Sequence, residues 1–568
     1  MKNLIDTSMR REKADFLFKN AKIVDVFTNT IIKTNFAVKH GYIVGFGDYE
    51  AYEEIDLFDS YVAPTLIDGH VHIESSKVTP SQFAKAVVPH GVLTVIADPH
   101  EIANVTGMDG IDFMLKDSEN LPLDVYIMAP SCVPATPFED SGAYIGVKEI
   151  EELMAIDRVL GLGEVMDFNS VINCDPEILE KIEKAKEYNK IIDGHCPGIT
   201  RDNLYAYALA GIKTEHECTN IEEMTDRLEL GMYIHIREGS AARNLRDLVK
   251  GVNKNNISRM MFCTDDREPC DLINHGSIDN NIRMAISLGL DPIDCIKMAT
   301  INTALVYNLK DVGAIAPGYK ANFITFNNLY DFNVEEVYRE GTIVAKGNQI
   351  LFGTQNTPCE NLMNTVNMKS LNKSDLTIVR AGNYINAIKI EPGNLVTKKI
   401  KINADKYFKD IVSNSIYSKI IVVERHKNTG NFALGIVEGF NIKNGAIAST
   451  VAHDSHNIIA IGDNDDDILL AVNELRKIGG GIVITSKEQI LGELALEIGG
   501  LMSNKPINEV SNELENLKII AHDNLGVPDE IEPFMTLSFL ALPVIPEIKI
   551  TDRGLFDVLE NKFIDLFD

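Results

Sequence analysis

Short apolar runs of strand length alternate with longer amphipathic segments between residues 62 and 312. Eight of these runs have the length and residue types of buried strands. They are Val62–Ile67, Leu93–Ala97, Asp124–Met128, Leu160–Val165, Ile191–Gly194, Ile212–Thr214, Tyr233–Ile236 and Met260–Cys263. The segments between them have helical length and spacing, as in Pro80–Val88 and Asp175–Tyr188. Eight strand–helix units are typical of a parallel (β/α)8 TIM barrel, and we predict that fold for residues 62–312.

Both flanks of this region show brief β-prone runs separated by turn residues. On the N-terminal side they fill Asp15–Ile55, and on the C-terminal side they return at Phe323–Phe326 and Val337–Glu340. Such runs are typical of short strands. Because two small β segments bracket the barrel, we predict that residues 1–61 and 313–355 pair into one small β-sandwich side domain.

The pattern changes again after residue 350. Leu351–Lys373 contains Gly, Pro, Thr and several Asn, which favours a linker. Beyond Asp375, β-rich runs such as Ile420–Val423 alternate with helix-length segments such as Asp465–Ile478. We predict a separate α+β domain over residues 375–568. The expected fold class is therefore α/β, with a TIM barrel, a side domain built from both flanks and a C-terminal α+β domain.

Composition narrows the class of partner and the location. The 568 residues exceed one ordinary core, and 45% hydrophobic content indicates a soluble globular protein. A net charge of -29 argues against nucleic acid or an anionic membrane as partner. No window approaches the ~20 apolar residues that cross a bilayer. The eight cysteines form no Cys-x-x-Cys pair, so we expect reduced thiols in a cytoplasmic protein without a signal peptide.

The end of the first predicted strand carries the first sign of chemistry, in the run Ile67-Asp68-Gly69-His70-Val71-His72. Residues two apart on a strand point to the same face, so His70 and His72 can hold one metal ion from one side. Catalytic groups of TIM barrels lie at the C-terminal ends of the strands. We therefore predict a metal site at this end of the barrel.

Four further strand ends supply possible ligands, which are Glu164, His195, His216 and Asp265. A single histidine at the end of a buried strand more often makes an ordinary hydrogen bond than binds a metal. Five strands that each deliver a ligand to one rim are a stronger signal. Four imidazoles and two carboxylates suit Zn²⁺, Mn²⁺ or Fe²⁺ rather than Ca²⁺. Two such ions generate hydroxide at neutral pH, and Asp265 beside it could pass a proton to a leaving group.

This order of ligands resembles the amidohydrolase superfamily, and longer motifs resemble the bacterial adenine deaminases within it. The motifs are Leu66–Glu74, Ala97–Asn104, Gly163–Met166, Asp193–Gly198, Arg237–Ala242, Cys263–Arg267 and Val451–Asn457. They span nearly the whole chain and together are highly specific. One departure is Pro64-Thr65, where the family usually has Pro-Gly, and it spares the ligands.

The resemblance implies hydrolysis of adenine to hypoxanthine and ammonia, by attack of a metal-bound hydroxide on C6 of the purine. The implied cofactor is binuclear Mn²⁺, with Fe²⁺ or Zn²⁺ as alternatives. One ion would be held by His70, His72, Glu164 and Asp265, and the other by Glu164, His195 and His216. Glu164 stands where many superfamily members carry a carboxylated lysine. The family also implies a homodimer or homotetramer.

Two further groups of residues receive roles. The expected catalytic residues are Asp265 as proton shuttle, with Glu217 and Glu238 to hold ring nitrogens. The expected substrate-binding residues are Asp98, His100, Glu101 and His456. For Asp98, a helix cap before Pro99 is an equal alternative. For His456, the alternatives are a surface loop and a loop that closes over the purine pocket.

Two other functions compete with adenine deamination. One is an amidohydrolase that acts on a different nucleobase, a modified adenine or a cyclic amide. The other is a non-catalytic scaffold that kept the fold and lost the chemistry. Because such scaffolds usually lose ligands and none is missing here, we favour the enzyme.

Overall fold

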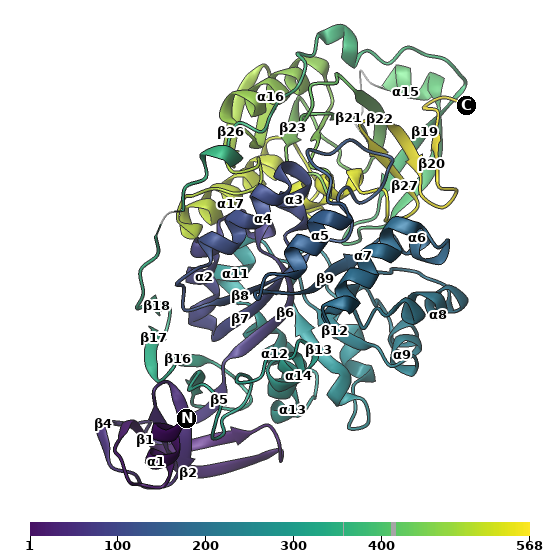
Figure 1. The fold of residues 1–568 in the computed structure, drawn as a ribbon. Coiled ribbons are helices and arrows are strands. Elements are labelled where there is room, and N and C mark those ends of the chain that lie inside the picture. Colours follow the sequence, from purple (N-terminus) through teal and green to yellow (C-terminus); the bar gives the residue numbers. More distant parts are fainter. Residues whose placement is uncertain (356, 411–415) are drawn as a thin grey trace.

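The computed structural model describes residues 1–355, 357–410 and 416–568. Residue 356, in the expected linker, and residues 411–415, in the expected C-terminal domain, lie outside the described residues. Figure 1 shows the side sheet at the bottom, the barrel in the middle and the C-terminal region at the top. The barrel therefore lies between the other two parts.

Parallel strands in chain order form the barrel. They are β6 (Leu66–His72), β7 (Val92–Ala97), β8 (Asp124–Ala129), β9 (Val159–Val165), β10 (Ile191–Gly194), β11 (Thr214–Glu215), β12 (Tyr233–Arg237) and β13 (Met260–Cys263). Hydrogen bonds order them as β10-β9-β8-β7-β6 and β11-β12-β13. The short β14 (Asp265–Asp266) follows β13 and pairs with β6, which joins the end of the second set to the start of the first. The predicted fold class is confirmed.

The first barrel strand begins later than predicted. The run Val62–Ile67 is divided between β5 (Tyr61–Pro64), which pairs with β15 (Phe323–Phe326) in the side sheet, and β6. The amide of Thr65 still donates to Asn322, whereas that of Leu66 donates to Gly91 before the second barrel strand. The chain therefore changes partner at this point, and His70 and His72 lie within β6 rather than after it.

Helices cover the barrel, and turn residues fix where several of them begin. For example, Asp175 caps α7 by accepting hydrogen bonds from the amides of Glu177 and Ile178, and Pro176 occupies the first helical position. The helices are α2 (Pro80–Val87), α3 (His100–Thr106), α4 (Met108–Asp117), α5 (Val147–Met154), α6 (Phe168–Ile172), α7 (Pro176–Glu187), α8 (Arg201–Ala210), α9 (Ile221–Glu229), α10 (Leu245–Leu248), α11 (Pro269–His275), α12 (Ile278–Ser287), α13 (Pro292–Met298) and α14 (Ile301–Val306). Within the described ranges, no helix has both the length and the apolar character needed to cross a bilayer.

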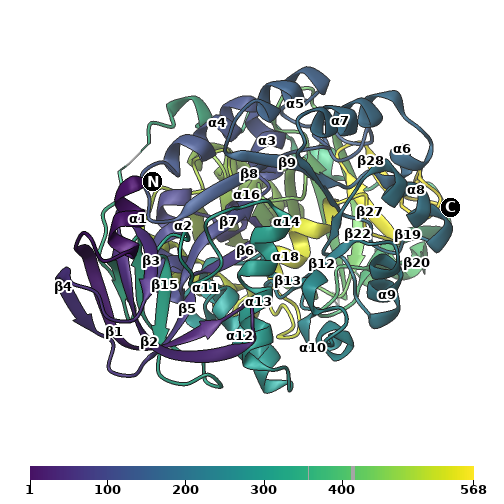
Figure 2. The same ribbon diagram turned by 60° about the horizontal axis from the view of Figure 1, so that its bottom comes forward.

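The side sheet joins both flanks of the barrel. Its nine strands form one sheet rather than two separate ones, in the order β18-β17-β16-β15-β5-β1-β2-β3, with β4 beside β1. Besides β5 and β15, they are β1 (Ala14–Asp25), β2 (Thr30–Lys39), β3 (Tyr42–Phe46), β4 (Ala51–Asp56), β16 (Val334–Arg339), β17 (Thr342–Lys346) and β18 (Gln349–Ile350). Phe18, Phe36 and Phe323 pack together in its core, at ring distances of 4.9–5.3 Å. In Figure 2, β1–β4 lie far from β19 (Tyr384–Ile390) and β20 (Thr397–Asn403) of the C-terminal region.

The C-terminal region is built on an eight-stranded sheet in the order β20-β19-β22-β21-β24-β23-β25-β26. Its strands are β19 (Tyr384–Ile390), β20 (Thr397–Asn403), β21 (Tyr417–Val423), β22 (Phe432–Glu438), β23 (Gly445–Ser449), β24 (Ile458–Gly462), β25 (Gly481–Ser486) and β26 (Gln489–Ala495). The other elements are α15 (Ala404–Asp410), α16 (Asp465–Ile478), α17 (Ile507–Asp523), α18 (Pro533–Ser538), β27 (Ile548–Thr551), β28 (Gly554–Asp557) and β29 (Lys562–Ile564). The amide of Ser503 donates to Lys77, and the Thr551 hydroxyl donates to Phe138. These bonds attach the region to the barrel loops.

Candidate metal centre

His70 and His72 lie side by side at the end of β6, both buried, with their Nε2 atoms 3.2 Å apart. The Nδ1 atom of His72 lies 2.9 Å from the backbone carbonyl oxygen of Asp98. A carbonyl only accepts, so this Nδ1 carries the hydrogen and Nε2 keeps its lone pair toward the cluster. This is the arrangement by which proteins orient metal-binding imidazoles.

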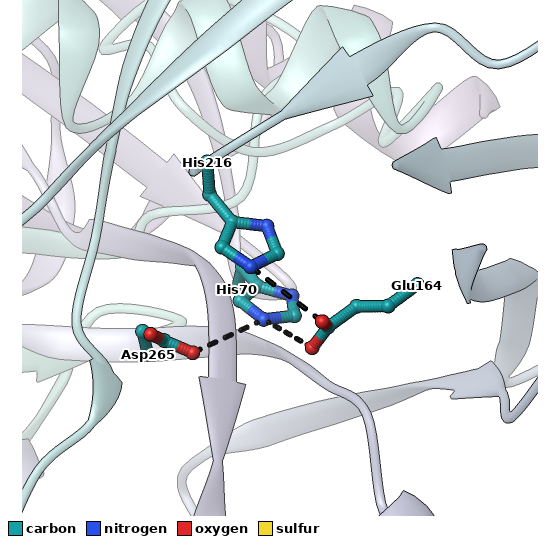
Figure 3. Close-up of side chains that lie close together, drawn as sticks. All are labelled: His70, Glu164, His216 and Asp265. Carbon is teal, nitrogen blue, oxygen red and sulfur yellow. Dashed lines mark ion pairs between the residues drawn. The ribbon is translucent and has the colours of Figure 1, made fainter. Parts of the chain in front are cut away.

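Glu164, at the end of β9, lies between two pairs of imidazoles. Its Oε1 is 3.0 Å from His70 Nε2 and 2.9 Å from His72 Nε2. Its Oε2 is 2.7 Å from His195 Nδ1 and 3.6 Å from His216 Nε2. Figure 3 shows His70 and His216 pointing toward the Glu164 carboxylate. Each oxygen of this carboxylate therefore faces a different pair of histidines.

Asp265 approaches the same cluster from the end of the eighth strand. Its Oδ1 lies 3.5 Å from His70 Nε2 and 3.1 Å from His72 Nε2, and Figure 3 shows it opposite Glu164. Its Oδ2 accepts a 2.9 Å hydrogen bond from Arg237. Its backbone φ of 57° is in the left-handed region that non-glycine residues seldom adopt, and such outliers concentrate at functional sites.

The cluster is buried and strongly charged. None of its six residues is more than 8% exposed. Burial by itself raises the pKa of Glu164, but His216 and His70 outweigh burial and hold that pKa well below its usual range. Burial likewise opposes the charge of Asp265, yet Arg237 and His70 keep its pKa well below the ordinary value. Two carboxylate anions therefore face four imidazoles in a site that attracts a cation.

Several buried polar atoms of the cluster lack hydrogen-bond partners, which fits a pair of divalent ions. Both ring nitrogens of His195 and the Oε1 atom of Glu164 are buried. None of these three atoms has a hydrogen-bond partner of suitable geometry among the described residues. Buried polar atoms normally have a partner. Histidine and carboxylate donors are those that Zn²⁺, Mn²⁺ and Fe²⁺ prefer. The chemistry of the residues therefore fits the metal pair that the sequence predicts.

The two other expected catalytic glutamates have different surroundings. Glu217 Oε1 lies 3.6 Å from His195 Nδ1 and 3.5 Å from His216 Nε2, at the edge of the cluster. Its carboxylate also pairs with Arg237. Glu238 is buried, and its Oε2 has no hydrogen-bond partner among the described residues. The contacts found there do not join Glu238 to the six residues of the cluster.

Asp98 supports Glu164 rather than capping a helix. Its Oδ2 accepts a 2.9 Å hydrogen bond from the Glu164 amide. The residue at the cap position of α3 is Pro99, so the alternative of Asp98 as a helix cap does not describe this structure. His100 packs against His72, at a ring distance of 4.6 Å. The structure thus brings both residues to the rim of the cluster.

Glu101 connects the barrel to the loop between β23 and β24. His453 Nδ1 lies 2.6 Å from Glu101 Oε1, and His456 Nε2 is bonded to Glu101 Oε2. All three residues are buried, so the surface-loop alternative for His456 is wrong. Sequence reasoning assigned no role to Arg237 and Asp454, although Arg237 lies beside the candidate Glu238 and Asp454 lies in the same loop as the candidate His456. For Arg237, the available signal was the presence of an arginine at the end of the seventh predicted strand.

Comparison with known proteins identifies the family of this chain. The amidohydrolase family model matches residues 61–344, and a model described as the adenine deaminase C-terminal domain matches residues 394–562. An adenine deaminase from Clostridium acetobutylicum is 48% identical over 564 residues, covering 99% of each chain. Adenine deaminase 2 from Carboxydothermus hydrogenoformans is 46% identical over 98% of each chain. Among solved structures, a β-aspartyl dipeptidase from Fervidobacterium islandicum AW-1 aligns over 61% of this chain and 99% of its own, with 18% identity and a TM-score of 0.45.

The barrel and its cluster of histidines and carboxylates define an amidohydrolase. The full-length relatives narrow this class further. The chain belongs to the adenine deaminase family within the amidohydrolases, and the resemblance seen in its sequence motifs is confirmed.

Proposed function

We propose that this chain is an adenine deaminase, which hydrolyses adenine to hypoxanthine and ammonia. Adenine deaminases that are 44–48% identical over nearly the whole chain support this activity. The structural observation that carries the proposal is the Glu164 carboxylate, with one oxygen facing His70 and His72 and the other facing His195. This arrangement suits a bridge between two ions.

The proposed cofactor is a pair of Mn²⁺ ions, with Fe²⁺ or Zn²⁺ as alternatives. One ion would be held by His70, His72, Glu164 and Asp265, and the other by Glu164, His195 and His216. When bound, such a pair lowers the pKa of water to near neutrality and polarises the group under attack. Because Glu164 is an ordinary carboxylate, the bridge would need no carbon dioxide.

Asp265 is the proposed proton carrier of the reaction. Arg237 holds its Oδ2, while Oδ1 faces the histidines. Arg237 therefore fixes the orientation of Asp265 and favours its ionised form. In that form, Asp265 can take a proton from the attacking water and give it to the exocyclic nitrogen as the C6–N6 bond breaks. The water oxygen remains on C6, and the nitrogen leaves as ammonia.

The proposed substrate contacts come from residues around this cluster. Glu217 lies next to His195 and His216, where it can hold a ring nitrogen. Glu238 has the same proposed role, and its own contacts lie outside the cluster. Asp98 orients the Glu164 backbone. The other proposed substrate residues are His100, Glu101 and His456.

The surroundings suit a small, uncharged substrate. The ligands are buried, and the loop that carries His453 covers the side of α3, so water is largely kept from the site. A neutral base pays a smaller desolvation cost on entering such a site than a charged compound does.

We further propose that the enzyme is a cytoplasmic homodimer or homotetramer, as the family resemblance implies.

The test is an ammonia assay on purified protein loaded with Mn²⁺, with adenine, adenosine, guanine and dihydroorotate as substrates. We expect ammonia from adenine, matched one to one by hypoxanthine. Absence of turnover with adenine would refute the proposal, and turnover of dihydroorotate instead would favour an amidohydrolase acting on cyclic amides. Protein that neither turns over any of these substrates nor binds metal would favour a non-catalytic scaffold.

A further inference from the structure

A second cluster of imidazoles and carboxylates lies beside the first, where the C-terminal region meets the barrel. His100 and Glu101 begin α3, and His453 and Asp454 belong to the loop between β23 and β24. Their exposed fractions are 4%, 2%, 4% and 2%. Figure 1 shows α3 on the side of the barrel that faces the C-terminal region. Two segments far apart in sequence therefore contribute two possible ligands each.

Each carboxylate of these four residues lies near both imidazoles. Glu101 Oε1 lies 2.6 Å from His453 Nδ1 and 3.5 Å from His100 Nε2. Asp454 Oδ1 lies 3.8 Å from His453 Nδ1 and 4.0 Å from His100 Nε2. Ligands of a tetrahedral zinc ion are about 3.3 Å apart, since each bond is about 2.0–2.1 Å long. The four separations are distributed around that value.

The Asp454 carboxylate has imidazole neighbours but no hydrogen-bond partner among the described residues. It makes no hydrogen bond within the part of the chain that the structure describes, and its Oδ2 is buried without a partner. Its imidazole neighbours, at 3.8 and 4.0 Å, are beyond hydrogen-bond distance. Burying an unpaired carboxylate is costly, and a cation among the four donors removes that cost.

His100 has the orientation of a ligand. Its Nδ1 lies 3.5 Å from Asp98 Oδ1, while its Nε2 faces Glu101 and Asp454. Neither His100 Nδ1 nor Asp98 Oδ1 has a hydrogen-bond partner among the described residues, but a hydrogen on Nδ1 would face this carboxylate and leave the lone pair of Nε2 toward the two acidic residues. Carboxylate–histidine–metal arrangements of this kind orient many protein ligands.

His456 is a positioning residue rather than a ligand. Its Nδ1 accepts a hydrogen bond of 3.1 Å from the Ala452 amide, so in the neutral ring the hydrogen must be on Nε2. That Nε2–H donates to Glu101 Oε2 and leaves Oε1 directed at His453 and His100. Arg425, which is fully buried, donates to the His456 carbonyl oxygen and holds the loop in place.

We propose that His100, Glu101, His453 and Asp454 form a third divalent metal site, which takes Zn²⁺ and joins α3 to the C-terminal region. Four protein ligands and no open position are typical of a structural zinc site. The site shares none of its ligands with the metal pair of the proposed function. It does use His100 and Glu101, so a zinc ion here would replace the substrate contacts proposed for these two residues, whereas the metal pair and the deamination reaction do not depend on it.

The test is the number of zinc ions bound per full-length chain. Protein stripped with a chelator is equilibrated with Zn²⁺ by dialysis, and bound zinc is measured by mass spectrometry. We expect three ions per chain in the wild type and two in His453→Gln and in Asp454→Asn. The control variants His275→Gln and Asp529→Asn change exposed side chains and should keep three.

Two results would overturn the proposal. Wild-type protein that binds two ions has no third site, and the second cluster is then an ion-pair network of protonated imidazoles and carboxylates. Three ions in both His453→Gln and Asp454→Asn would place the third ion elsewhere. The near-isosteric Asp454→Asn keeps the test usable if His453→Gln does not fold. Adenine deamination, assayed on the same samples, reports separately on the proposed function.

Discussion

Glu164 and Asp98 are joined by a hydrogen bond of 2.9 Å from the Glu164 amide to the Asp98 carboxylate, which passes over Gly163. A Cβ atom on Gly163 would lie 2.2 Å from Asp98 Oδ2. Residue 163 of β9 must therefore be glycine, because any side chain there would push the Asp98 carboxylate away. The position of Glu164 in the cluster depends on this close approach.

Gly163→Ala should disturb the metal centre without removing a ligand. We expect a destabilisation of about 1–3 kcal/mol from overpacking and a fall of at least tenfold in kcat/KM for adenine. Steady-state kinetics and metal analysis would measure both effects. Gly353→Ala is the control, because nothing lies within 4 Å of the Cβ that it adds. Equal kinetics in the two variants would show that the Asp98 contact is dispensable.

Asp265→Asn should lower kcat by roughly 10²–10⁴-fold, the range for loss of a general acid–base group. Asparagine can still contact Arg237 and the imidazoles, but it does not take up a proton at neutral pH. The measurement is kcat per bound metal, which separates proton transfer from metal loss. The exposed Asp529→Asn is the control. A kcat within a few fold of the wild type would assign proton transfer to another group.

Removal of metal should abolish activity reversibly, and Glu164 should be required for recovery. We expect chelated wild-type protein to regain ammonia production when Mn²⁺ is added, because the imidazoles and carboxylates remain in place. Glu164→Gln loses the negative charge between the two pairs of histidines, so it should bind at least one metal fewer and recover little activity. The exposed Glu53→Gln should behave as the wild type does. Full recovery in Glu164→Gln would rule out the bridging role.

Lys549 should give the protein a stability that increases with pH. Burial lowers the pKa of this lysine to about 7, and its ammonium group donates to the carbonyl oxygens of Leu395 and Phe539. Between pH 7 and the unfolded value near 10.4, the unfolded chain holds one more proton than the folded one. The free energy of unfolding should therefore rise with pH, by at most about 1.4 kcal/mol per unit.

Urea unfolding of the wild type and Lys549→Met at pH 7 and pH 9 measures this effect. The free energy of unfolding of the wild type should rise relative to that of Lys549→Met between the two values. Lys254→Met, at an exposed position, should not change the slope. A difference between wild type and Lys549→Met that stays constant with pH would show that the buried lysine does not titrate in this range.

The sequence predicted most reliably what depends on local pattern. Buried parallel strands are continuous apolar runs, and β10 and β13 have the predicted bounds. The first strand was misplaced because the apolar run continues through Pro64 and Thr65, where the chain changes from one sheet to the other. The alternation of His70 and His72 on one strand face was enough to bring both side chains to one side.

What the sequence could not predict depends on long-range packing. Glu101 and His456 are 355 residues apart, and no periodicity links them. The orientation of Glu238 could not be predicted either, because side-chain direction at a strand end depends on the following loop. The contacts of Arg237 with Glu217 and Asp265 likewise arise only when three separate strand ends meet.

The contact between Glu101 and His453 joins the barrel to a segment that is synthesised much later. Domains generally fold as units, starting from the N-terminal end of the emerging chain. All six residues proposed to hold the metal pair precede His453, so a nascent barrel that binds ions could acquire them before the covering loop has left the ribosome. When the loop that carries His453 later packs against the barrel, it can thus enclose metal ions that the barrel has already bound.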